Sequence, residues 1–262
     1  MTTERASQQA FFSAAALLFA ASAALTIGWS TSMSSMDMPM PGGWTMSMMW
    51  MRMPDQTWLS AAGSFLGMWV VMMVAMMLPS LVPILHRYRR AVAGAGLNRV
   101  SRLTALVGAG YFLVWSAFGI VAFPLGVALG ALAMREPAFA RAVPFAISAI
   151  VVIGGALQFT AWKARHLACC RAAPPCRCAL PADSRMAFRH GLRLGVHCCY
   201  CCGGLTAILL VIGAMDLRVM TVVTAAITLE RLAPSGERVA RIIGAIVIVA
   251  GLILFTHGIG LA

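Results

Sequence analysis

The chain has 262 residues, of which 61% are hydrophobic and only 11% are charged, whereas soluble domains have about 25% charged residues. This composition excludes a soluble globular enzyme, a disordered protein and a disulfide-rich secreted scaffold. The apolar runs are too long and too unbroken for barrel strands. We therefore predict an all-α fold, a polytopic transmembrane helical bundle with six to seven spans, forming a single transmembrane domain over residues 1–262.

Seven apolar segments follow one another along the chain. Their ranges are 10–30, 58–85, 103–133, 142–162, 195–215, 218–230 and 242–260. The segment at 218–230 is short for a span of about 20 residues, so we expect either a partial helix or a helix that includes the first residues of the next loop. The first segment lacks a clear cleavage site and is interpreted as an uncleaved span.

The basic residues indicate an orientation. With the N-terminus in the cytoplasm, 16 of the 20 Lys and Arg residues fall on the cytoplasmic side, as the positive-inside rule requires. This arrangement accounts for the whole net charge of +12 and leaves no basic patch for nucleic acid. It also predicts a Met-rich outer loop at 31–57 and a basic, Cys-containing cytoplasmic loop at 163–194.

The outer loop is dense in methionine and broken by Gly and Pro, with no helix or strand pattern. Thioethers select Cu(I) over harder ions, which makes this loop a candidate site for metal capture. The alternative is a cap in which Met fills space. The candidate ligands in this loop are Met36, Met38, Met40, Met46, Met48 and Met49.

Methionine continues into the second span. Met68, Met72 and Met76 are spaced four residues apart, so a helix would place them on one face. Such a stripe is either core packing or a continuation of the metal site. Pro79 and Pro83 are expected to break the helix near its inner end.

All eight cysteines lie between residues 169 and 202, on the cytoplasmic side of the predicted topology. Because the cytosol is reducing, a disulfide framework is not expected. Thiolates bind Cu(I) or Zn(II), so metal or redox chemistry is weighed against simple apolar packing. The first cluster follows His166 and contains Cys169, Cys170, Cys176 and Cys178.

The second cluster falls within the fifth apolar segment. A helix would bring its members onto adjoining faces near one end. The candidate ligands are His197, Cys198, Cys201 and Cys202, with Cys199 between them. Elsewhere in the spans polar residues are few, and Glu230–Arg231 is interpreted either as a functional intramembrane pair or as an interfacial ion pair.

The chain resembles a bacterial family of predicted metal-binding integral membrane proteins of unknown function. The resemblance runs from about 58 to 255 and implies a metal without naming it. The segments that carry it are Met68-Trp69 with Met72–Ser80, Tyr111-x-x-x-Trp115, Gln158-x-Thr160-x-x-Lys163, Cys169–Arg171, Cys198-x-x-Cys201-Cys202, Gly213-x-Met215 and Glu230–Arg231.

The sorting of thioethers outside and thiols inside predicts Cu(I) binding and transfer or transport across the bacterial inner membrane. Zinc is the alternative metal. The expected partners are the metal ion, the lipid bilayer, and a copper chaperone or metalloenzyme client. A membrane metalloenzyme or a thiol redox protein using residues 198–202 is the alternative function, and a structural assembly partner is a third. No nucleotide-binding motif occurs in the sequence, and no catalytic residue is predicted.

Overall fold

The structure is a computed structural model that describes residues 2–34, 38–52, 56–171 and 183–261. Two 3-10 turns, at Met48–Trp50 and Ala93–Ala95, join the longer elements. The helices and strands, in chain order, are α1 (Thr2–Ser34), β1 (Met38–Met40), β2 (Trp44–Met46), α2 (Trp58–Ala91), α3 (Leu97–Arg135), α4 (Pro137–Leu157), α5 (Ala161–Arg171), α6 (Ser184–Gly213), α7 (Leu217–Leu232) and α8 (Gly236–Leu261).

The predicted all-α bundle is confirmed. Among the described residues, six helices are long and apolar enough to cross a membrane, namely α1, α2, α3, α4, α6 and α8. The seventh predicted segment forms α7, which has 16 residues and is therefore about 24 Å long at 1.5 Å per residue. That is less than the hydrocarbon core of about 30 Å, so the expected short helix is present.

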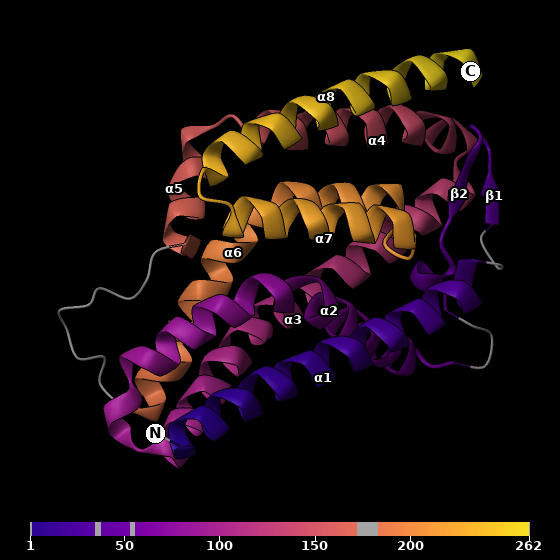
Figure 1. Ribbon diagram of the computed structural model, residues 1–262. Helices are drawn as coiled ribbons and strands as arrows, with labels where there is room; N and C mark the ends of the chain where they lie inside the picture. Colours follow the sequence, from indigo (N-terminus) through magenta and orange to yellow (C-terminus); the bar gives the residue numbers. More distant parts are fainter. Residues whose placement is uncertain (1, 35–37, 53–55, 172–182, 262) are drawn as a thin grey trace.

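The helices form an elongated bundle (Figure 1). α1, α2 and α3 lie together on one side, α4 and α8 pack along each other on the other, and α6 contacts α3, α4, α5 and α7. The N-terminus lies at the same end as the α2–α3 connection, and the C-terminus lies at the opposite end, near the two strands. The chain therefore runs through the bundle an odd number of times.

Glycines let α3 and α6 approach to backbone contact. A Cβ atom on Gly110 would lie 2.5 Å from the carbonyl oxygen of Phe188, and one on Gly195 would lie 2.9 Å from that of Tyr111. A Cβ on Gly191 would meet the carbonyl oxygen of Val107. Only glycine permits such close approach, and this packing brings the middle of α3 against the middle of α6.

The Met-rich loop departs from its prediction, because part of it has regular structure. β1 and β2 form a two-stranded antiparallel ladder in which Met38 pairs with Met46. Trp44 Nε1 donates a hydrogen bond to the carbonyl oxygen of Ala140 at 2.9 Å, and Trp50 packs where Gly126 of α3 has no side chain. This segment thus caps one end of the bundle. Its two short strands show no alternation of apolar and polar residues, which is why the sequence did not predict them.

Two further expectations were wrong in detail. α2 continues through Pro79 and Pro83 to Ala91 instead of breaking, because helices in apolar surroundings keep every backbone hydrogen bond that remains available. Within the predicted inner loop at 163–194, the described residues at both ends are helical rather than irregular, because α5 extends to Arg171 and α6 begins at Ser184.

Candidate metal site

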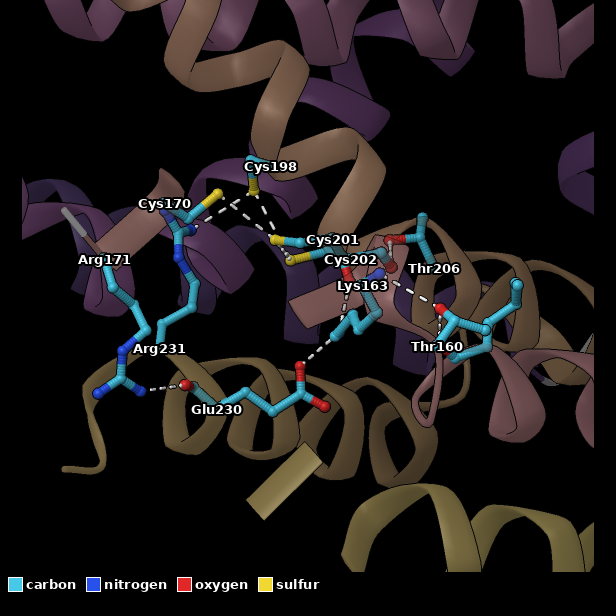
Figure 2. A network of polar contacts seen from close by, with 11 residues as sticks. Thr160, Lys163, Cys170, Arg171, Cys198, Cys201, Cys202, Thr206, Glu230 and Arg231 are labelled. Atoms are coloured by element: carbon cyan, nitrogen blue, oxygen red, sulfur yellow. Dashed lines mark hydrogen bonds and ion pairs between the residues drawn. The ribbon is translucent and has the colours of Figure 1, made fainter. Parts of the chain in front are cut away.

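Three cysteines of α6 point to the same place in the bundle core (Figure 2). The Sγ atoms of Cys198 and Cys202 are 3.7 Å apart, and those of Cys201 and Cys202 are 3.4 Å apart. All three sulfurs lie within 4.8 Å of one another and are buried. Thiolates around a metal at about 2.3 Å lie about 3.8 Å apart, so this trio could hold a metal ion with little movement.

A fourth thiol reaches the trio from α5. Cys170 is 1% exposed, and its Sγ lies 3.5 Å from the Sγ of Cys201. The two cysteine clusters of the sequence therefore meet in one place, which we call the thiol cluster: Cys170, Cys198, Cys201 and Cys202. Cys169 is exposed and Cys199 is half-buried, while Cys176 and Cys178 lie outside the described residues.

A buried guanidinium faces the thiol cluster from the end of α7. Arg231 Nη1 donates hydrogen bonds to Ser80 Oγ at 2.9 Å, Tyr111 Oη at 3.3 Å and Cys198 Sγ at 3.4 Å. Tyr111 Oη is itself 2.9 Å from Cys198 Sγ. The Nε and Nη2 atoms of Arg231 have no hydrogen-bond partner among the described residues. Such a buried cation is stabilised by an anion, which a thiolate or an anionic metal–thiolate complex would provide.

A buried ion pair holds α5 and α7 beside α6. Lys163 Nζ lies 2.6 Å from Glu230 Oε2 and also donates to the carbonyl oxygen of Cys201. Burial by itself lowers the pKa of Lys163, but the Glu230 carboxylate, together with the neighbouring cysteines Cys202 and Cys201, raises this pKa above its usual value. The partner of Glu230 is therefore Lys163 and not the adjacent Arg231, and both side chains of the pair are buried in the protein.

The last residue of α5 caps the end of α7. Arg171 donates hydrogen bonds to the carbonyl oxygens of Glu230 at 2.8 Å and Pro234 at 3.0 Å. Helix C-terminal carbonyls lack partners within their own helix, and basic side chains commonly satisfy them. Arg171 thereby fixes the end of α7 that carries Arg231 (Figure 2).

His197, a predicted ligand, is paired with a second histidine. Its Nδ1 atom lies 3.1 Å from Nδ1 of His166 on α5, and both side chains are half-exposed. Burial, together with the charges of His197 and Arg165, lowers the pKa of His166, which favours its neutral form. Among the described residues the metal-capable group contains the α6 cysteines and does not include His197.

The predicted methionine ligands divide into three environments. Met38 is exposed, Met40 and Met48 are half-exposed, and Met36 lies outside the described residues. Met46 and Met49 are buried in the cap, and the sulfur of Met46 packs beside Gly130. These buried positions match the cap alternative for this part of the loop.

The methionine stripe of α2 is fully buried and leads toward the thiol cluster. Met68, Met72 and Met76 are at most 8% exposed. The next residue at the same spacing is Ser80, which accepts the hydrogen bond from Arg231. One face of α2 thus carries thioethers and ends at Ser80, whose hydrogen-bond donor, Arg231, also contacts Cys198.

Sequence reasoning did not assign Ser80, Tyr111 and Lys163 to the site. None carries a spacing signal, because each reaches the site from a different helix. The available signal was the family resemblance, since its segments contain all three residues together with Glu230 and Arg231.

A family model, PpoB2, described as a copper chaperone, matches residues 66–254. The matched range covers more than two thirds of the chain and includes every residue of the thiol cluster. No curated protein and no solved structure matches the chain.

Proposed function

The chain belongs to the PpoB2 copper chaperone family, and from this we propose that it binds Cu(I) at the thiol cluster and passes it on within the membrane. The observation that carries the proposal is the meeting of Cys170 with the three α6 cysteines beside Arg231. Thiolates are soft ligands that select Cu(I). The membrane is proposed to be the bacterial inner membrane, with the N-terminus in the cytoplasm.

The charges around the thiol cluster support an anionic complex. Lys163 and Glu230 neutralise each other, which leaves Arg231 as one uncompensated buried cation when all the thiols are protonated. Cu(I) bound by two thiolates carries one negative charge and would balance this cation. Zn(II) with three thiolates has the same charge, so zinc is the competing ion, and the family description favours copper.

The α2 stripe supports a route to the thiol cluster. We propose that Cu(I) moves between Met72 and Met76 and the thiolates by ligand exchange, with the thiolates as the stronger ligands. Transport across the membrane and transfer to a partner both need such a route. The partner would be a copper chaperone or a metalloenzyme that receives the ion.

The route predicts a phenotype for Met72→Leu/Met76→Leu. Leucine fills a similar volume, and such core exchanges cost less than about 1.5 kcal/mol, so the double variant should fold. Cells that carry it should accumulate or tolerate less copper than cells with the wild-type chain. The control is Met134→Leu, at an exposed position. Wild-type copper handling by the double variant would contradict the route.

The proposed function is tested by the affinity of anaerobically purified protein for Cu(I), measured by competition with a coloured Cu(I) chelator. We expect Cys198→Ser/Cys202→Ser to lose the tightly held ion. Cys199→Ser and Cys169→Ser are matched controls, because they alter neighbouring thiols outside the thiol cluster, and they should bind as the wild type does. A wild-type chain without tight Cu(I) binding would overturn the proposal.

A thiol redox function is the second candidate, because Cys170 and Cys201 approach to 3.5 Å. If this is the function, a mild thiol oxidant should link these two residues reversibly in the metal-free protein. Peptide mass spectrometry would detect the link. Rapid disulfide formation in a chain that binds no Cu(I) would favour this candidate over copper transfer.

A further inference from the structure

α5 and α6 face each other with two successive pairs of metal-binding side chains. His166 lies 3.1 Å from His197 through their Nδ1 atoms. Four residues later on both helices, Cys170 lies 3.5 Å from Cys201 through their sulfurs. Four residues are about one helical turn, or 6 Å along the axis, so an imidazole pair stands about one turn from a thiol pair.

The two pairs differ in their access to the surroundings. Both histidines are half-exposed, whereas Cys170 and Cys201 are at most 3% exposed. An ion that reaches the thiol pair from outside the bundle along these two helices would meet the imidazoles first.

Two aromatic rings pack against His166. The ring of Trp162 lies 4.8 Å from that of His166 in an edge-on arrangement, and the Tyr200 ring lies 4.9 Å away. Trp162 and Tyr200 also contact each other at 5.5 Å. Trp162 and Tyr200 are themselves 45% and 49% exposed, so the imidazole pair lies beside two aromatic rings at the surface of the bundle.

The geometry suits a metal ion. Imidazole nitrogens bind metals at about 2.0–2.1 Å, and at that length a separation of 3.1 Å corresponds to a nitrogen–metal–nitrogen angle of about 100°. Imidazole accepts copper but is a harder ligand than thiolate. The pair would therefore hold Cu(I) more weakly and release it more readily than the thiol cluster.

We propose that His166 and His197 form a second copper site, a relay through which Cu(I) enters and leaves the thiol cluster. The proposal rests on the proposed function of that cluster. In the transfer, two copper–nitrogen bonds break and two copper–sulfur bonds form with Cys170 and Cys201. The two S–H protons leave to solvent, and copper stays Cu(I), so no electron is exchanged.

The relay is tested on full-length protein in detergent under anaerobic conditions, with Cu(I) supplied as a complex of a water-soluble chelator. His166→Phe/His197→Phe keeps a ring at each position and removes both ligands. We expect Cu(I) loading of the thiol cluster to slow at least tenfold in stopped-flow absorbance, while its equilibrium affinity changes less than threefold. The control is His190→Phe. His190 lies on α6, as His197 does, and its ring stacks on that of Tyr88.

A second measurement isolates the relay from the thiol cluster. In a chain whose four cluster cysteines are changed to Ser, one weakly bound Cu(I) should remain and quench the fluorescence of Trp162, which is identified by loss of the signal in Trp162→Phe. Adding the two His→Phe changes should abolish this binding. Absence of the weak ion, or loading of the His variant at the wild-type rate, would overturn the relay. A wild-type chain that holds no tight Cu(I), with the weak ion still present, would overturn the cluster's function instead.

Discussion

At the scale of single residues, the site is organised by one buried cation. Arg231 contacts Cys198, Tyr111 and Ser80, which come from three different helices, yet two of its nitrogens have no partner among the described residues. A buried charge with incomplete hydrogen bonding costs free energy in the metal-free protein. The same charge would stabilise an anionic metal–thiolate complex, so under the proposed function Arg231 would link the metal affinity of the site to its folding.

Arg231→Gln should therefore weaken Cu(I) binding more than it weakens the fold. A hydrogen bond to a charged group contributes about 1.5–3 kcal/mol, which corresponds to a loss of about 10- to 150-fold in affinity. The thermal midpoint of the metal-free protein should change little, because the unpartnered nitrogens leave with the side chain. Arg238→Gln, at an exposed position, is the control. A lower midpoint with unchanged affinity would assign Arg231 a purely structural role.

Lys163→Met should have the opposite effect, because it should weaken the fold more than it weakens Cu(I) binding. The variant leaves the Glu230 carboxylate, which is 1% exposed, without its cation, and breaking a buried pair in this way costs about 3–5 kcal/mol. Thermal unfolding should detect this loss, and adding Glu230→Gln should recover part of it. Arg165→Met, an exposed change on the same helix, should unfold as the wild type does. If the double variant regains no thermal stability, the loss in Lys163→Met does not come from an unpaired Glu230.

At the scale of elements, the sequence predicted the helices but not the way in which they meet. Long apolar runs are sufficient for α2, α3 and α6, because backbone groups in apolar surroundings must bond within their own helix. The contact between Cys170 and Cys201 depends instead on how α5 folds back on α6. That contact is a tertiary contact between residues 31 positions apart, so the local spacing of residues cannot predict it.

The spacing of His197, Cys198, Cys201 and Cys202 correctly predicted that they lie on one helix, but it grouped His197 with the thiols on adjoining faces. The structure pairs His197 with His166 instead. The choice is decided by α5, whose sequence alone gives no sign that it packs against α6. The same holds for Lys163, whose carboxylate partner lies 67 residues away.

The contact between α3 and α6 should be sensitive to a single methyl group. In Gly191→Ala the new Cβ would meet the backbone carbonyl of Val107, which cannot move without its helix. Overpacking of this kind costs about 1–3 kcal/mol, and separation of the helices would draw Tyr111 away from Cys198. We expect lower thermal stability and weaker Cu(I) binding. Gly203→Ala is the matched control on α6, since its Cβ would have open space, and equal behaviour of the two variants would contradict the packing.

At the scale of the whole molecule, α7 decides the topology. Six helices are long and apolar enough to span, which by themselves would return the C-terminus to the side of the N-terminus. α7 is short, yet it runs back through the bundle and ends at the thiol cluster, and the two termini lie at opposite ends (Figure 1). With α5 packed at its end, α7 makes a further pass through the bundle beside the six candidate spans.

Reporters fused to the two termini should therefore lie on opposite sides of the membrane, with the N-terminal one in the cytoplasm, because the positive-inside rule places the basic connections there. Insertions after Gly96 and after Glu136, in the connections on either side of α3, calibrate the cytoplasmic and outer signals. A fluorescent protein that matures only in the cytoplasm and a phosphatase active only outside give complementary readings. If both termini lay on one side, α7 would enter and leave at the same face of the membrane. That result would contradict the arrangement in which α7 crosses the bundle and brings Arg231 to the thiol cluster.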